Sequence, residues 1–189
     1  MQAGLRAVRL LYELRGLLLK EIMSQIADAL ERFRRGGELL STALMGCAGQ
    51  EADFKRAPGQ WSVRQLVCHL ADTQIVIAMR IRLILAEENP TLGAFDQDAW
   101  ANNLDYGKRK ISHAIETFRR LRGEDFELMK DLPEPAFERT GMHVERGRLT
   151  LGSMVEQQAV HVESHVKQIQ AVRAAYKEHK AKLAAAPQV

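Results

Sequence analysis

Apolar residues recur three and four positions apart in four long stretches of the chain, a spacing that predicts amphipathic helices with one buried face. The predicted helices span about residues 24–45, 63–88, 108–130 and 151–180. Their predicted inward positions are Ile26, Leu30, Phe33, Gly37, Leu40 and Leu44; Val63, Leu66, Leu70, Ile77, Ile81 and Ile84; Ile111, Ile115, Phe118, Leu121 and Leu128; and Leu151, Met154 or Val155, Gln158, His161, His165, Ile169, Val172 and Tyr176. Gly37, on the inward face of the first predicted helix, marks a close approach to a neighbouring helix.

Local signals mark where these helices begin and end. Ser62 and Gln65 form an S-x-x-Q capping box, and Trp61 precedes it as one half of a hydrophobic staple. The pair Asn89–Pro90 ends that helix, because the residue before proline disfavours the helical conformation. Thr150 is predicted to cap the fourth helix.

The connections between the helices are polar and show no strand pattern. Segment 94–107 is a long polar and aromatic connection with a short helix inside it, and 132–148 is a second long loop. The sequence therefore predicts an all-α protein, a four-helix bundle with an extra N-terminal helical extension. The predicted division is 1–22 for the extension, 23–180 for the bundle and 181–189 for a disordered tail.

Charge and composition narrow the classes of function. The 189 residues carry a formal net charge of +3, and we interpret Arg34–Arg35 and Arg119–Arg120 as solvated helix faces rather than nucleic-acid contacts. Two cysteines, Cys47 and Cys68, are too few for a disulfide framework and fit a reducing, cytoplasmic setting. No stretch approaches the ~20 apolar residues of a membrane span. We expect neither nucleic acid nor a membrane as a partner.

His161 and His165 stand four residues apart on the predicted inner face of the fourth helix. Residues at this spacing differ by about 40° around the helix axis and about 6 Å along it. Both imidazoles can therefore point at one atom between them, which suits two-point metal chelation. The alternative is that each is a hydrogen-bonded core residue, because such a pair arises easily by chance.

A metal site of this kind needs a third ligand, and His69 is the candidate. It lies at the edge of the apolar stripe of the second helix, and a facing helix in a bundle can reach the same interior point. His113 is a weaker candidate on the third helix, and His179 lies near the tail at a position that we expect to be exposed.

Three segments, in this order, resemble the DinB-like (YfiT-type) family of four-helix bundles: APGQWSVRQLVCHLAD, AFDQDAW and HVERGRLTLGSMVEQQAVHVESHVKQI. The resemblance covers about residues 26–174. It implies a divalent metal ion, zinc or nickel, bound by one histidine of the second helix and an H-x-x-x-H pair of the last; here these are His69, His161 and His165. Family members often carry aspartate and histidine inside the pair, where this chain has Val162 and Ser164, so the groups around the ligands differ.

The resemblance also implies a metal-dependent hydrolase or a transferase that activates a low-molecular-weight thiol. Three neutral histidines leave an ion with open positions, as in catalytic sites, and such an ion lowers the pKa of a bound water or thiol. The alternative is a non-catalytic or stress-associated bundle whose metal is structural. The expected partner is a small-molecule substrate, with a thiol among the candidates, and a homodimer is one hypothesis for the assembly.

Some side chains near the predicted site keep two interpretations. Asp72, one turn beyond His69, either orients an imidazole or acts as a base, or it forms a salt bridge. Gln158, one turn before His161, either bonds a metal-bound water or satisfies another buried group. His143 either reaches the rim of the site or bonds to the backbone of its own loop.

The remaining candidates concern the surroundings of the site. Trp100 and Tyr106 either line a substrate pocket or plug the open end of the bundle. We expect Glu163 to be solvated, and Cys68 to be a small core residue rather than a ligand.

Overall fold

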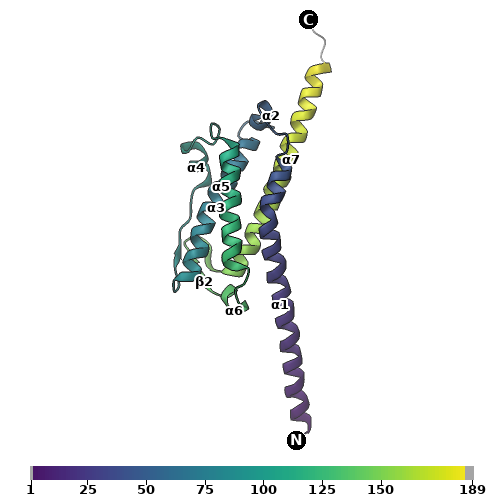
Figure 1. Cartoon of the computed structure of the whole chain (residues 1–189), viewed down its shortest axis with the longest axis vertical. Coiled ribbons are helices and arrows are strands. Elements are labelled where there is room, and N and C mark those ends of the chain that lie inside the picture. Colours follow the sequence, from purple (N-terminus) through teal and green to yellow (C-terminus); the bar gives the residue numbers. More distant parts are fainter. Residues whose placement is uncertain (1, 186–189) are drawn as a thin grey trace.

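The computed structural model describes residues 2–185, with side chains described from residue 16 onward except at 18, 19 and 22. Four long helices form a bundle (Figure 1): α1 spans Gln2–Ala43, α3 Val63–Ala86, α5 Ile111–Met129 and α7 Leu151–Ala185. The short helices α2 (Gln50–Asp53), α4 (Gln97–Asn103) and α6 (Glu134–Phe137) lie in the connections. The predicted all-α four-helix bundle is therefore confirmed, and so is the short helix within 94–107.

The four long helices form two parallel pairs that run in opposite directions (Figure 1). In the first pair, Arg32 of α1 bonds Glu163 of α7 at 2.9 Å, and the carbonyl of Ala43 at the end of α1 accepts from Arg173 further along α7. In the second pair, Arg64 at the start of α3 donates to the Arg109 carbonyl just before α5, at 2.9 Å. The connection from α3 to α5 consequently crosses the length of the bundle.

α1 is one helix from Gln2 to Ala43, so the described part of the predicted extension, residues 2–22, is continuous with the first bundle helix. At 1.5 Å per residue its 42 residues span about 63 Å, against about 29 Å for the 19 residues of α5. The N-terminal half of α1 projects beyond the bundle (Figure 1). α7 also continues past its predicted end at Lys180, to Ala185, and residues 186–189 of the predicted tail lie outside the described residues.

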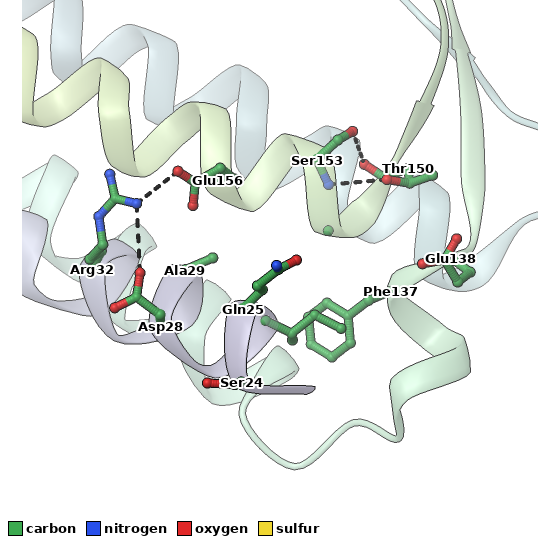
Figure 2. A pocket seen from close by; sticks show the side chains of 12 residues that line it. Ser24, Gln25, Asp28, Ala29, Arg32, Phe137, Glu138, Thr150, Ser153 and Glu156 are labelled. Carbon is green, nitrogen blue, oxygen red and sulfur yellow. Dashed lines mark hydrogen bonds and ion pairs between the residues drawn. The ribbon is translucent and has the colours of Figure 1, made fainter. Parts of the chain in front are cut away.

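A groove of about 790 Å³ lies where α1 leaves the bundle beside the start of α7 (Figure 2). Ile26, Ala29 and Phe137 are among its apolar walls. On one side of it, Arg32 lies 2.7 Å from the carboxylate of Glu156. The described residues that line this groove include no histidine, so it is separate from the candidate site.

The predicted helix-start signals are present as hydrogen bonds. The Ser62 hydroxyl accepts from the backbone N–H of Gln65 at 3.3 Å, and the Gln65 side-chain oxygen accepts from the backbone N–H of Ser62 at 3.1 Å. Thr150 caps α7 by accepting from the Ser153 N–H at 3.0 Å. These caps satisfy N–H groups that a helix start otherwise leaves unpaired, and they fix where α3 and α7 begin.

Two apolar clusters fill the interior at different heights along the bundle. One joins the C-terminal end of α1 to the first halves of α3 and α5 and the middle of α7, and the other joins α1 near Phe33 to the second half of α3 and the start of α7. Between them lies a polar layer made of Gln74, Arg122 and Asp125, none of which exposes more than 1% of its surface.

Arg122 of α5 connects all four long helices within this polar layer. Its guanidinium donates to the Phe33 carbonyl of α1, to Gln74 Oε1 of α3 at 2.9 Å and to the Gln158 carbonyl of α7 at 3.2 Å. It also lies over the Phe33 ring, 3.8 Å from its centroid. Gln74 in turn donates to the Asp125 carboxylate at 2.8 Å. The buried charge is therefore hydrogen-bonded on every side, as such a group requires.

Gly36 provides the space for this guanidinium, because a Cβ at that position would lie 2.7 Å from the Arg122 Nε. The predicted close approach at Gly37 thus occurs one residue earlier. The prediction for α5 was also wrong in its second half, since Leu128 is 45% exposed while Arg122 and Asp125 point inward. The pattern considered only apolar residues, and these buried positions are occupied by charged ones.

A three-stranded sheet corrects the prediction that no strand is present. β1 (Thr91–Leu92) pairs in parallel with β2 (Thr140–His143), which pairs antiparallel with β3 (Gly147–Thr150). Gly141 lies against the fully buried Leu92, where a Cβ would come within 2.8 Å of that side chain. The strands are too short for an alternating pattern to be visible in the sequence.

The arginines that the sequence analysis interprets as solvated lie on the described surface. Arg34, Arg35, Arg119 and Arg120 are all exposed. Among the described helices, none is long and apolar enough to cross a membrane.

Candidate metal centre

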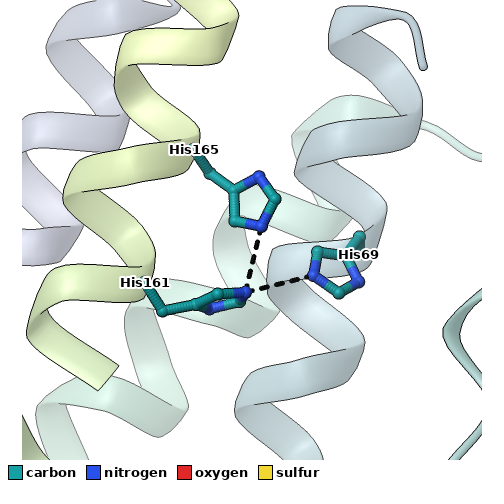
Figure 3. Close-up of side chains that lie close together, drawn as sticks. All are labelled: His69, His161 and His165. Carbon is teal, nitrogen blue, oxygen red and sulfur yellow. Dashed lines mark hydrogen bonds between the residues drawn. The ribbon is translucent and has the colours of Figure 1, made fainter. Parts of the chain in front are cut away.

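Three imidazole rings meet between α3 and α7 (Figure 3). The Nε2 atom of His161 lies 3.0 Å from that of His165 and 3.3 Å from that of His69. One nitrogen from each ring lies within 4.8 Å of the other two. The predicted convergence of the second and fourth helices is therefore confirmed.

The two helices position these rings in different ways. On α7, the four-residue spacing places His161 and His165 one above the other, at the edge of a buried stripe that includes Val162 and Val166. On α3, His69 is 1% exposed, and the Trp61 ring packs against it with centroids 5.1 Å apart. The histidines of α7 are partly exposed, so the site can be reached from solvent on that side.

Two of the three nitrogen separations fit a tetrahedral metal ion. Two ligand atoms that each lie 2.0–2.1 Å from such an ion are about 3.3–3.4 Å apart, close to the two measured Nε2 separations. Three imidazoles are also a donor set that zinc and nickel accept. No carboxylate or thiol joins the group within the described chain, so a divalent ion would keep its full charge there.

All three rings are held in the neutral form that metal binding requires. Burial lowers the pKa of His69 to about 4 and that of His161 to about 3, and the neighbouring histidines add to both effects. Burial also lowers the pKa of His165. Near neutral pH, the three ring lone pairs are therefore not blocked by protons.

The three rings differ in the hydrogen bonding of their Nδ1 atoms. His165 Nδ1 lies 2.9 Å from the side-chain oxygen of Gln168, which favours the tautomer with a free lone pair on Nε2. The Nδ1 atoms of His69 and His161 are buried and have no hydrogen-bond partner in the described chain. This departs from the usual arrangement, in which each ligating imidazole donates its other N–H to the protein. Val162, where the family often has aspartate, points into the core instead.

The carboxylates that the sequence places beside the ligands are both ion-paired. Asp72 is buried and accepts from Arg109 at 2.7 Å, so the salt-bridge interpretation holds for this residue. Glu163, expected to be solvated, instead accepts two bonds of 2.9 Å from Arg32 on α1, because α7 packs closely along α1.

Several other candidates have structural roles. His143 is buried, and its Nδ1 accepts from the backbone N–H groups of Glu145 and Arg146 at the hairpin turn, so it bonds to its own loop. Gln158 is partly buried and contributes its carbonyl to Arg122. His113 and His179 are exposed and belong to no metal-ligand group in the described chain.

The two loop aromatics belong to the interior rather than to a pocket. Tyr106 is fully buried in an apolar cluster, and Trp100 packs against that cluster and against Phe95, with ring centroids 4.7 Å apart. Cys68 is fully buried in the same cluster, as predicted. Cys47 and Cys68 are both free cysteines.

Two contacts at the site were missed by sequence reasoning. Gln168 follows His165 by three residues and Trp61 precedes the capping box of α3, and both touch a histidine ring. The helical spacing of Gln168 could have indicated its contact. Nothing in the local pattern indicates that Trp61 turns toward His69.

Comparison with known proteins identifies relatives of this chain. The family model described as DinB superfamily matches residues 9–169. A protein of Oceanobacillus iheyensis named "Putative metal-dependent hydrolase OB0782" is 28% identical over 157 residues, which cover 83% of this chain and 87% of that protein. "Putative metal-dependent hydrolase YfiT" of Bacillus subtilis is 30% identical over 104 residues, 55% of this chain and 58% of that protein.

A solved structure shares the fold. It is described as "YfiT from Bacillus subtilis is a probable metal-dependent hydrolase with an unusual four-helix bundle topology". The two structures superpose with a TM-score of 0.76 at 24% sequence identity, covering 82% of this chain and 89% of the other. The arrangement of two parallel helix pairs is thus one that a known protein also adopts.

Proposed function

Since the chain belongs to the DinB superfamily, we propose that His69, His161 and His165 bind a divalent metal ion, zinc or nickel, and that the protein is a metal-dependent hydrolase. The observation that carries this proposal is the meeting of three neutral ring nitrogens from two helices at ligand spacing. The names of the relatives, which describe metal-dependent hydrolases, support the same class of reaction.

When bound, the metal would supply Lewis acidity, which lowers the pKa of a water or thiol and polarises a carbonyl. The protein's own contribution is to hold three imidazoles at fixed positions, with His165 oriented by Gln168 and His69 by the Trp61 ring. Asp72 and Glu163 are engaged in ion pairs. Activation of the nucleophile therefore rests on the ion rather than on a carboxylate base.

A second candidate is transfer of a low-molecular-weight thiol. It is favoured by the absence of carboxylate ligands in the three-histidine group, because an ion that keeps its full charge stabilises a thiolate as well as a hydroxide. A third is a non-catalytic bundle in which the metal is structural. Metal content alone does not distinguish these three candidates, whereas measured turnover of a hydrolase or a thiol substrate does.

The test begins with elemental analysis of protein purified without chelators. The metal found is restored to stoichiometry, and the loaded protein is assayed against panels of amide and ester substrates and of thiols with an electrophilic acceptor. His161→Ala should lose both metal and turnover, and His113→Ala, a histidine outside the group, should keep both. Two results together would refute the proposal: the protein stays metal-free after reconstitution, and its melting curve is the same with and without chelator.

The cytoplasmic setting and the homodimer remain part of the proposal. Two free cysteines, Cys47 and Cys68, fit a reducing compartment. Light scattering behind size-exclusion chromatography measures whether the 21.3 kDa chain assembles as a pair.

A further inference from the structure

A hollow of about 370 Å³ lies about one helical turn from His69 and His165, between the first turns of α3 and the middle of α7. Its walls include Leu66, three residues before His69, and Gln168, three residues after His165. Three residues correspond to about one turn. The volume is within the range of small-molecule sites in proteins.

This hollow shares two walls with the candidate metal centre. Trp61 lines it, and the same indole packs against the His69 ring with centroids 5.1 Å apart. Gln168 lines it, and the same side chain lies 2.9 Å from His165 Nδ1. A molecule in the hollow would thus touch the residues that hold two of the histidines.

The lining of the hollow combines apolar side chains with one cationic side chain. Trp61, Leu66 and Val172 provide the apolar surface, while Arg56 comes from the loop before α3. The neighbouring acids are already engaged, since Asp53 pairs with Arg64 at 2.6 Å and Glu51 with Arg173 at 2.6 Å. Among the described ion pairs, none involves Arg56.

The free guanidinium and the metal centre point to the same kind of ligand. A guanidinium beside an apolar surface favours a carboxylate attached to an apolar body. Three neutral imidazoles would leave the ion positive, which favours an anionic molecule as well.

We propose that this hollow binds the non-reacting part of the substrate, an apolar group that carries a carboxylate paired with Arg56. The assignment of this part to a substrate rests on the proposed function. The binding itself is a property of the protein and can be measured without metal.

The experiment uses benzoate and its neutral counterpart benzamide as probes of chelator-treated full-length protein. Trp61 fluorescence reports binding in a Trp100→Phe background, in which Trp61 is the remaining tryptophan. Benzoate should bind about three- to fivefold more tightly than benzamide, the value of one partly exposed ion pair. Arg56→Gln should remove this preference and leave benzamide binding unchanged. Lys55→Gln, a neighbouring exposed cation that does not line the hollow, should keep the preference.

Three outcomes would overturn the inference. These are probes that leave Trp61 fluorescence unchanged, a preference that survives Arg56→Gln, and a preference that Lys55→Gln removes equally. The proposed function is tested separately with cobalt(II), which should quench Trp61 through its proximity to His69. Quenching without carboxylate preference would leave the metal centre standing and reject the hollow, and the reverse result would reject the metal centre alone.

Discussion

The contact between Gly36 and Arg122 predicts that one substitution has opposite effects on stability in two backgrounds. In the parent protein, the methyl group of Gly36→Ala would lie 2.7 Å from the Arg122 Nε and 3.0 Å from its Cζ. The guanidinium would have to move away from the Phe33 and Gln158 carbonyls that it bonds. Arg122→Leu removes the atoms that the methyl group would meet.

The magnitudes follow from the burial of this arginine. Burial lowers the pKa of Arg122 from 12.5 to about 9, which corresponds to a cost of about 5 kcal/mol for the charged form. Its three hydrogen bonds offset this at about 1.5–3 kcal/mol each. Arg122→Leu also leaves the side-chain oxygen of Gln74 unpaired, which costs about 1–3 kcal/mol. These terms together span about 0.5–7 kcal/mol, so we expect this substitution to destabilise the protein by a few kcal/mol.

Gly36→Ala should destabilise the parent by about 1–3 kcal/mol, because the displaced hydrogen bonds outweigh the gain of ~1 kcal/mol in helix propensity. In the Arg122→Leu background, only the propensity gain remains, so the same change should stabilise by up to ~1 kcal/mol. Urea unfolding of the four chelator-treated proteins, followed by circular dichroism, gives the coupling energy directly. Equal effects of Gly36→Ala in both backgrounds, or stabilisation of the parent, would refute this reasoning.

The other predictions concern the histidines and the N-terminal segment. His161→Ala and His165→Ala should each abolish stoichiometric metal and retain helical circular dichroism, because apolar burial supplies the folding energy; elemental analysis measures this, with His113→Ala as control. Metal-free protein should lose stability as the pH falls from about 6.5 towards 4, because the pKa of His69 is about 4 when folded and the unfolded chain binds protons that the folded chain does not. Urea midpoints at pH 7.5 and 5 test this, and equal midpoints contradict it. Truncation to Met23 should leave cooperative unfolding intact, and loss of folded protein would show that residues 1–22 stabilise the bundle.

Apolar periodicity predicted the helices well wherever the buried face is apolar. In α3, all six predicted inward residues are buried, and the Ser62 capping box fixed its start. In α5, the pattern failed after Phe118, because Arg122 and Asp125 occupy the next buried positions. A charged residue can be buried only when its partners come from other helices, and those partners are not visible in the local sequence.

The three histidines of the candidate site differ in how far the sequence could predict them. The four-residue spacing of His161 and His165 follows from helix geometry alone. His69 required α3 and α7 to be neighbours, which the resemblance implied and the local pattern could not. The orientation of His69 by Trp61 depends on how a loop folds back over α3, and no periodic signal encodes it.

The pairing of α1 with α7 joins the first and last long helices of the chain, since Arg32 and Glu163 are 131 residues apart in sequence. On the ribosome, α1 emerges before α7, so the part of its apolar face that α7 covers stays uncovered until α7 has been synthesised. His161 and His165 belong to α7, so the proposed metal centre can form only after α7 has been synthesised. Contacts this distant in sequence slow folding, and a nascent chain of this protein should therefore depend on chaperones longer than a bundle of sequential hairpins does.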